Sequence, residues 1–488
     1  MSFLDLIPWE LSLGDKIARA FMSTKNLVLI RAPAGSGKTS VAIAYLIYRA
    51  MLGERGALFL RTKREVEHAL GIAKKISEKT DTNLLIMPSP SKEDFCVMAL
   101  NKELIKYWCP ISECERLSRR KYSDLEAFLR RNVFASLSEY VNLLASGKRC
   151  PYYVALGLLR KANIVFGTHS YFIRSDLFEK LGKLDIVIVD EAHELLFPKT
   201  YEGNYEVVEE GREIAHSVEE QGIALSRYIV SLGRSMDYES AKKLAEYDAY
   251  READGAYILL GKKIVKIYPP AILIRDRLRS VRKIVVMSST LYPSNFFRML
   301  FAKDMEHELI VIPGLIGGRR KIIVVDTNLS LSYRMRNEET YKAYAELIRR
   351  IYLKHREKTL VFCPSYKVAE EIAKHLKTKP TDKLGGDLVI TVFRGRIAEG
   401  IDATGYRVAI MAGLPFPMID METREILKLY SGIYHIDIEA LENAYSLSSM
   451  ISALVQAMGR VGRREEGVIY IIDSRAKKYL GNIIVSES

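Results

Sequence analysis

A glycine-rich turn early in the chain has the residue types that bind phosphate groups. It follows the apolar run 27–30 and reads Ala32-Pro33-Ala34-Gly35-Ser36-Gly37-Lys38-Thr39. The glycines let the backbone approach phosphate oxygens, and the N–H groups at the start of the next helix supply positive potential. Lys38 can reach the β- and γ-phosphates, and the Thr39 hydroxyl can bind Mg²⁺. The turn predicts a triphosphate site, whose residues we assign as Ala34, Gly35, Ser36, Gly37, Lys38, Thr39 and Ser40.

A pair of acids follows another apolar run. Asp190-Glu191-Ala192-His193 comes directly after residues 186–189. An acid at the end of a parallel strand lies at the edge of the sheet where ligands bind. Asp190 can hold Mg²⁺ through its water shell, and Glu191 can orient and deprotonate an attacking water. Together with the upstream phosphate turn, the pair predicts triphosphate hydrolysis.

A basic segment near the C-terminus can stabilise a transferring phosphoryl group. Gln456, Arg460 and Arg463 are spaced by four and by three residues, which places them on one face of a helix. Guanidinium groups on one face can neutralise charge that develops on the γ-phosphate. A solvated basic helix end would show the same spacing, so this assignment depends on the other two motifs.

Short apolar runs alternate with helical patterns along the chain. Candidate buried strands lie at 27–30, 57–60, 164–166, 186–189, 284–287, 360–362, 388–390 and 468–472. This alternation predicts an α/β fold with parallel sheets that helices cover on both faces. Two segments interrupt it, 92–150 with helical and charged character and 201–275 with helical periodicity. We therefore expect a first α/β unit from 1–91, 151–200 and 276–312, with 92–150 and 201–275 inserted, and a second unit from 313–488.

Four of the five cysteines fall within 55 residues, at Cys96, Cys109, Cys114 and Cys150. In a large chain without a signal-peptide pattern, such a cluster favours metal over disulfides. Four thiolates can bind an iron–sulfur cluster or Zn²⁺, and the spacing alone leaves both open, with free thiols as a third reading. Cys363 follows a strand pattern and is interpreted as an ordinary core thiol.

The composition sets wider limits on the class of protein. The 488 residues are 48% hydrophobic, which excludes disorder as the main state. Lys and Arg exceed Asp and Glu by 13, which permits nucleic acid, an anionic membrane surface or simply a basic surface. No apolar run reaches the ~18 residues of a membrane span, and the N-terminus lacks a basic, apolar leader. We expect a cytoplasmic protein and, because it has only two glutamines, a thermophilic prokaryotic source.

The set and order of these motifs resemble superfamily 2 helicases, and the cysteines resemble those of the XPD family of iron–sulfur helicases, with DinG-type relatives second. The resemblance covers nearly the whole chain. Further matches are Arg61-Thr62, Ser288-Ser289-Thr290-Leu291, Phe362-Cys363-Pro364-Ser365-Tyr366, Gly395-Arg396-Ile397-Ala398-Glu399-Gly400-Ile401-Asp402 and Asp473-Ser474-Arg475. The resemblance implies two RecA-like parallel-sheet motor domains, the first with a Cys-rich iron–sulfur insertion and a small helical arch-like insertion.

The same resemblance implies a DNA-stimulated ATP hydrolase that moves 5′ to 3′ on single-stranded DNA and unwinds duplexes in repair-type processing. Its cofactors would be ATP, Mg²⁺ and a [4Fe–4S] cluster on Cys96, Cys109, Cys114 and Cys150. It assigns Asp402 to the nucleotide, and it assigns to the strand Arg61, Thr62, Ser365 and Tyr366. We expect a monomer that binds single-stranded and forked DNA, with repair or transcription accessory proteins as candidate partners.

Some residues depart from the family pattern. Lys63 stands where His is usual, Arg396 where Lys is usual, and Trp9-Glu10 near the expected position of an adenine-contacting glutamine. The segment 201–275 is shorter than the family's arch. These departures leave two alternatives, an ATP-regulated DNA clamp or scaffold without strong unwinding, and an RNA helicase, since DEAH motifs occur there too.

Overall fold

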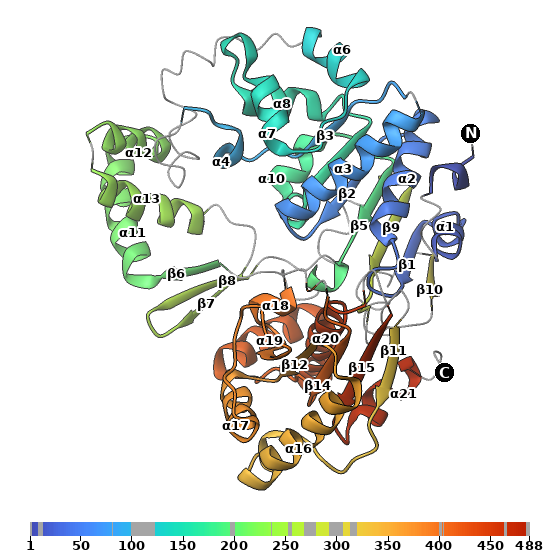
Figure 1. Ribbon diagram of the computed structural model, residues 1–488. Coiled ribbons are helices and arrows are strands. Elements are labelled where there is room, and N and C mark those ends of the chain that lie inside the picture. Colours follow the sequence, from blue (N-terminus) through green and yellow to red (C-terminus); the bar gives the residue numbers. More distant parts are fainter. Residues whose placement is uncertain are drawn as a thin grey trace. The chain divides into compact units, whose positions relative to one another are not determined.

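The structure, a computed structural model, describes residues 2–7, 13–80, 82–98, 123–195, 201–235, 237–251, 256–267, 280–291, 306–312, 320–399, 403, 405–462 and 466–484 (Figure 1). The chain divides into two compact units. The first comprises Met1–Ile7, Thr24–Leu27 and Thr39–Val286, and the second comprises Pro8–Ser23, Val28–Lys38 and Met287–Ser488. Among the described helices, none has the length and apolar character to cross a membrane.

A seven-stranded sheet has the order β10-β1-β9-β5-β2-β4-β3. The pairs β2–β4, β2–β5, β3–β4 and β5–β9 are parallel. Every residue of β2, β5 and β9 is buried, as continuous apolar runs predict for a parallel sheet covered on both faces. The strands are β1 (Leu27–Arg31), β2 (Gly56–Leu60), β3 (Ile86–Pro88), β4 (Ile164–Thr168), β5 (Ile186–Val189), β9 (Lys283–Ser288) and β10 (His307–Val311).

Helices around this sheet present apolar stripes to it. In α3 the buried residues recur at helical spacing, and the helix packs on β2 and β4. The short α9 contacts the same two strands, and α8 contacts β3. The helices are α1 (Gly14–Phe21), α2 (Lys38–Met51), α3 (Lys63–Thr80), α8 (Pro151–Leu159), α9 (His169–Ile173) and α10 (Ser175–Phe178).

The described part of segment 92–150 is helical, as expected. It contains α4 (Lys92–Phe95), α6 (Ser123–Arg131) and α7 (Leu137–Leu144). A capping box of Ser136 and Glu139 starts α7, and the buried hydroxyl of Tyr140 donates to the carbonyl of Ile86 in β3 at 2.8 Å. Both α7 and α8 contact α4. The segment is thus bonded to one edge of the sheet.

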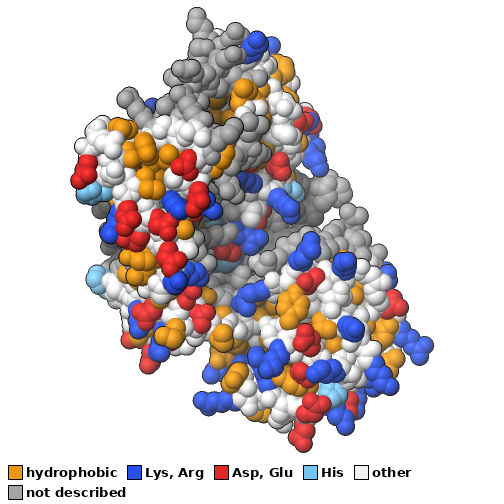
Figure 2. Space-filling model, turned by 90° about the vertical axis from the view of Figure 1, so that its left-hand side faces the viewer, with side chains coloured by type: hydrophobic (Ala, Val, Ile, Leu, Met, Phe, Trp, Pro, Cys, Tyr) orange, Lys and Arg blue, Asp and Glu red, His pale blue; other side chains and the backbone are white. Residues whose placement is uncertain are grey.

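The segment 201–267 forms the expected helices but also a small sheet that the sequence analysis missed. The helices α11 (Tyr205–Glu220), α12 (Leu225–Arg234) and α13 (Tyr238–Arg251) enclose an apolar core, and an ion pair joins Lys243 of α13 to Glu210 of α11. Figure 2 shows acidic and basic side chains interspersed on this face of the molecule. An antiparallel sheet of order β6-β8-β7 contains β6 (Tyr201–Asn204), β7 (Ala256–Leu260) and β8 (Lys263–Ile267). Two apolar runs around Gly261, whose φ is +62°, were the available hairpin signal.

A five-stranded parallel sheet of order β11-β15-β14-β12-β13 forms the core of the rest of the second unit. Alternate strand residues face opposite sides. Val361 and Cys363 pack with α16 and α17, whereas Leu360 and Phe362 pack with α18, α20 and α21. The strands are β11 (Arg320–Val324), β12 (Thr359–Cys363), β13 (Leu388–Val392), β14 (Val408–Ala412) and β15 (Gly467–Ile472). The helices are α16 (Glu338–His355), α17 (Tyr366–Leu376), α18 (Arg396–Glu399), α19 (Met421–Tyr434), α20 (Ile438–Met458) and α21 (Ala476–Ile484).

The two parallel sheets with helices on their faces confirm the predicted α/β fold class, and all eight predicted strands form. Four further described strands of these two sheets, β3, β10, β11 and β14, were not predicted. The domain boundaries expected from the sequence stay predictions.

Candidate active site

The phosphate-binding turn lies between β1 and α2, as predicted. Gly35 and Gly37 have φ of +75° and +89°, a left-handed conformation that glycine adopts without steric cost. Lys38 is only 5% exposed, and its ammonium donates to the carbonyl oxygens of Ala32 at 3.1 Å and Pro33 at 3.0 Å. The carbonyls hold the ammonium beside the turn, where phosphate oxygens would compete for it.

The buried hydroxyl of Ser36 fits a phosphate ligand. Within the described part of the chain, Ser36 Oγ has no hydrogen-bond partner. A buried polar atom without a partner is costly in a folded protein, and such atoms gather where a ligand binds. A phosphate oxygen in the turn would accept this hydroxyl, which supports the triphosphate assignment.

Thr39 and Asp190 meet at the sheet edge. Thr39 Oγ1 donates to Asp190 Oδ2 at 2.5 Å, and Asp190 is 4% exposed. The backbone N–H of Asp190 donates to the carbonyl of Phe59 at 2.9 Å, which fixes the end of β5 against β2. A hydroxyl and a carboxylate are oxygen donors of the kind that Mg²⁺ prefers while it keeps several waters. The donor set fits the predicted magnesium site.

Glu191 adopts an unusual backbone conformation next to Asp190. Its φ is +46°, rare for a residue with a side chain and costly unless the surroundings hold it. Its Oε2 lies 3.3 Å from Nδ1 of the buried His193, and its N–H donates to Asp190 Oδ1 at 2.9 Å. Such strain concentrates at functional sites and is in keeping with Glu191 as the base for the attacking water.

His169 is a site residue that the sequence analysis missed. Its Nε2 lies 2.8 Å from the carbonyl oxygen of Asp190. Burial lowers the pKa of His169 to about 4, so the imidazole is neutral at neutral pH. The signal in the sequence was its position three residues after the apolar run 164–166, toward the same sheet edge as Asp190.

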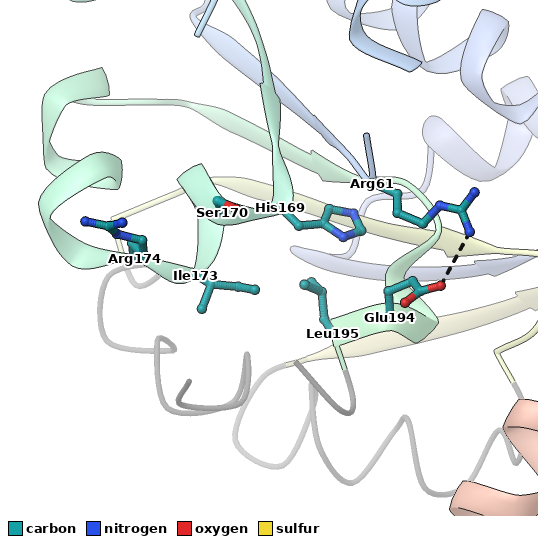
Figure 3. A pocket seen from close by; sticks show the side chains of 7 residues that line it. All are labelled: Arg61, His169, Ser170, Ile173, Arg174, Glu194 and Leu195. Carbon is teal, nitrogen blue, oxygen red and sulfur yellow. Dashed lines mark ion pairs between the residues drawn. The ribbon is translucent and has the colours of Figure 1, made fainter. Parts of the chain in front are cut away.

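A cavity of about 160 Å³ lies next to His169 (Figure 3). Ile173 and Leu195 face its centre, and Arg61 and Arg174 lie at opposite ends. The guanidinium of Arg61 points to Glu194, with Nη1 at 3.6 Å from Oε1. Seven residues line the cavity: Arg61, His169, Ser170, Ile173, Arg174, Glu194 and Leu195.

Arg61 and Thr62 have different local roles at the start of α3. Thr62 Oγ1 accepts the N–H of Glu65 and its own N–H donates to Glu65 Oε2, each at 3.2 Å, which is a helix-capping arrangement. Arg61 Nε lies 3.5 Å from Glu65 Oε1. Burial lowers the pKa of Arg61, but Glu65, Glu194 and Glu191 outweigh it and raise that pKa, so Arg61 stays charged.

Ser288 joins the phosphate turn to the segment 288–291, one of the segments that match the family pattern. Its carbonyl accepts the N–H of Ala32 at 3.2 Å, and its hydroxyl lies 3.2 Å from the hydroxyl of Thr290. Ser288, Ser289 and Thr290 are all buried. A backbone hydrogen bond therefore joins this segment to the phosphate-binding turn.

The prediction that Gln456 and Arg460 share a helix face is wrong. Helix α20 contains Gln456 and ends at Met458, and Arg460 lies in a turn with its Nε bonded to the carbonyl of Ala398 at 2.6 Å. Arg463 lies outside the described residues. Gly462 turns the chain a few residues beyond the helix end. Its φ is +62°, and a Cβ there would lie 3.0 Å from the Gly467 backbone, so the chain needs glycine to turn.

The strand-binding candidates of the second unit lie at the start of α17. Ser365 caps this helix by accepting the N–H of Val368 at 3.4 Å. Tyr366 is 47% exposed, and its hydroxyl donates to Asp382 Oδ2 at 2.7 Å. The hydrogen bond to Asp382 raises the pKa of Tyr366, which keeps the phenol neutral.

Two of the four clustered cysteines lie in the described residues. Cys96 directly follows α4, buried Cys150 directly precedes α8, and these two helices contact each other. Within the described ranges, no group of three or more His, Cys, Asp or Glu side chains could hold a metal. Several predicted residues lie outside those ranges: Trp9, Glu10, Cys109, Cys114, Gly400, Ile401, Asp402 and Arg463.

Two family models match the chain. Residues 59–200 match DEAD_2, and residues 381–485 match the helicase C-terminal domain. The ATP-dependent DNA helicase XPD of Sulfolobus acidocaldarius is 22% identical over 97% of this chain and 96% of its own. A solved XPD helicase matches 100% of this chain and 98% of its own, at 18% identity and a TM-score of 0.64. Xpd4 of S. tokodaii matches 98% of both chains, at 17% identity and a TM-score of 0.56. The chain belongs to the XPD-like helicases.

Proposed function

We propose that the chain is an ATP-dependent DNA helicase that translocates 5′ to 3′ on single-stranded DNA and unwinds duplexes in repair-type processing. The observation that carries the ATPase assignment is the 2.5 Å contact between Thr39 Oγ1 and Asp190 Oδ2. It joins the phosphate turn to the acid motif. The match to the S. acidocaldarius helicase along its length supports the assignment to DNA.

The ATP step follows from the residues at this sheet edge. The N–H groups of the turn and the ammonium of Lys38 neutralise the phosphates, and Ser36 Oγ donates to a phosphate oxygen. Thr39 and Asp190 would hold Mg²⁺, which supplies charge neutralisation at the phosphates. Glu191 takes the proton of the attacking water. We assign Gln456, Arg460 and Arg463 to the charge that develops on the transferring phosphoryl group.

Arg61, Thr62, Ser365 and Tyr366 are the proposed strand contacts. Thr62 and Ser365 cap α3 and α17, so their contribution is to shape helix starts whose N–H groups can bind phosphates. Arg61 supplies a permanent charge for a phosphate, and the exposed ring of Tyr366 offers a face on which a base can stack. These contacts act on backbone and ring faces, so we expect little sequence specificity.

The cysteine set fits an iron–sulfur cluster in its chemistry. Cys96 and Cys150 end and begin two helices that contact each other, which brings the first and last thiols of the set to neighbouring elements. With Cys109 and Cys114 they would supply the four thiolates of a [4Fe–4S] cluster. The cluster would tie segment 92–150 together, because such a small segment lacks a large apolar core. Asp402, the domain boundaries, a monomeric state, a cytoplasmic location and a thermophilic source remain our predictions.

The decisive experiment uses protein purified without oxygen. ATP hydrolysis is measured with and without single-stranded DNA, and strand displacement is measured on 5′- and 3′-tailed duplexes of DNA and RNA. We expect DNA-stimulated hydrolysis and unwinding of 5′-tailed DNA, both abolished by Lys38→Ala. Stimulated hydrolysis without displacement would instead identify a clamp, and displacement only from RNA tails would identify an RNA helicase.

A further inference from the structure

A chain of polar contacts joins the proposed strand contact Arg61 to the proposed base Glu191. Arg61 Nη1 lies 3.6 Å from Glu194 Oε1, and His193 Nε2 lies 3.6 Å from the same oxygen. The other nitrogen of His193, Nδ1, lies 3.3 Å from Glu191 Oε2. One carboxylate oxygen is therefore shared by the guanidinium of a proposed strand contact and an imidazole that contacts the proposed base.

The elements around Glu194 keep this arrangement in place. Glu194 belongs to the short 3₁₀ turn Ala192–Leu195, and its N–H donates to the carbonyl of Glu191 at 3.1 Å. His193 is buried, whereas the side chains of Arg61 and Glu194 are 28% and 31% exposed. Both Arg61 and Glu194 line the cavity in Figure 3.

We propose that Glu194 is a positioning residue that couples phosphate binding at Arg61 to the orientation of Glu191. The proposal rests on the function proposed above. A backbone phosphate of the strand would compete with Glu194 for the Arg61 guanidinium, because both are anions that bind it through charge-assisted hydrogen bonds. The shared oxygen then serves His193 alone. A firmly held His193 in turn holds Glu191 in the position from which it acts on water.

Glu65 provides a natural comparison. It also pairs with Arg61, with Oε1 at 3.5 Å from Nε, and its other oxygen accepts the N–H groups of Arg61 and Thr62. No contact between Glu65 and His193 is found in the described structure. Both carboxylates therefore compete with DNA for Arg61, but only Glu194 also contacts the imidazole.

The test compares Glu194→Gln with Glu65→Gln in the full chain. For each we measure the ATPase kcat with and without saturating single-stranded DNA, the KM for ATP, and the DNA concentration at half-saturation. Glu194→Gln should lower the stimulated kcat by about tenfold, the order of effect expected when one carboxylate charge is removed close to the partially exposed site. The ATPase rate without DNA and the KM for ATP should stay within about twofold of the wild-type values, and DNA binding should tighten. Glu65→Gln should tighten DNA binding and keep the stimulated kcat.

Tighter DNA binding together with a lower stimulated kcat would distinguish coupling from a structural defect. A structural defect would weaken DNA binding and lower the rate together. As a second measurement, His193→Gln in the Glu194→Gln background should add little further loss, because the two residues act in one chain. An unchanged stimulated kcat in Glu194→Gln, or a loss that follows weaker DNA binding, overturns the inference alone. If DNA does not stimulate ATP hydrolysis by the wild-type protein, the proposed function is overturned as well.

Discussion

Thr39 Oγ1 lies 2.5 Å from Asp190 Oδ2, although 151 residues separate the two in the chain. Both are held by the sheet, since Thr39 lies in the first turn of α2 after β1 and Asp190 directly follows β5. The contact brings together a hydroxyl and a carboxylate that would hold a magnesium ion.

Thr39→Val should remove the hydroxyl with little change of shape. We expect the ATPase rate to fall by about a hundredfold, because a metal ion supplies several kcal/mol of charge stabilisation in such reactions. Thr39→Ser keeps the hydroxyl and should retain most of the rate. The measurement is ATP hydrolysis over a magnesium titration, and equal rates for the valine variant and the wild type would contradict the assignment.

Cys96→Ser and Cys150→Ser should each lose the bound cluster. The measurement is visible absorbance together with iron and acid-labile sulfide, of which a cubane cluster holds about four each. Cys363→Ala is the matched control. Cys363 is completely buried in the core of the second unit, and burial raises the pKa of its thiol to about 12, so it is not a thiolate ligand. Stoichiometric zinc in the wild-type protein would contradict the iron–sulfur assignment.

Most of the fold was predictable from the sequence because buried parallel strands are continuous apolar runs. The strands that were missed show why the remaining part of the fold was not predicted. The strands β10 and β11 are only partly buried and carry charged residues such as Glu308 and Lys321. The strand β3 has only three residues. In contrast, β14 is a fully buried apolar run at 408–412, and its signal was present in the sequence.

The site was predictable where the local sequence of a motif determines the arrangement of its residues. The phosphate turn and the acid pair meet as expected, since both follow parallel strands of one sheet. His169 and Glu194 were missed because their roles depend on which strand ends lie next to each other, and no local spacing encodes that. Arg460 was placed on a helix because its spacing from Gln456 fits one, but the glycines after Met458 end the helix first.

His169 should make stability depend on pH below neutrality. Its pKa in the folded protein is about 4, against an ordinary 6.5, so between these values the unfolded chain binds a proton that the folded chain does not. Lowering the pH through this window should reduce the free energy of unfolding by at most about 1.4 kcal/mol per pH unit. His169→Gln should remove this part of the slope. Denaturant unfolding from pH 4 to 7 compares the two, and identical slopes would contradict the prediction.

Arg475→Lys should destabilise the second unit. Asp473 is nearly completely buried and accepts bonds from Nε and Nη2 of Arg475, both at 2.8 Å, as well as from the N–H of Leu414 at 3.1 Å. Burial alone would lower the pKa of Arg475, but the bond to Asp473 raises it overall. Lysine cannot make the paired contact, and we expect a loss of about 1–3 kcal/mol in the free energy of unfolding. Lys477→Arg, at an exposed ion pair with Asp326, is the control and should change stability little.

Gly211→Ala should separate two helices of the inserted bundle. A Cβ at this position would lie 2.2 Å from the carbonyl oxygen of Lys243, so α11 and α13 could not keep their present approach. We expect a loss of about 1–3 kcal/mol in the stability of the bundle, the usual cost of overpacking, and faster limited proteolysis between residues 205 and 251. Gly71→Ala is the matched control, because a Cβ at Gly71 in α3 meets nothing within 4 Å and alanine favours the helix by about 0.5–1 kcal/mol. If Gly211→Ala resists protease as well as the wild type does, the close approach of α11 and α13 is not what holds the bundle together.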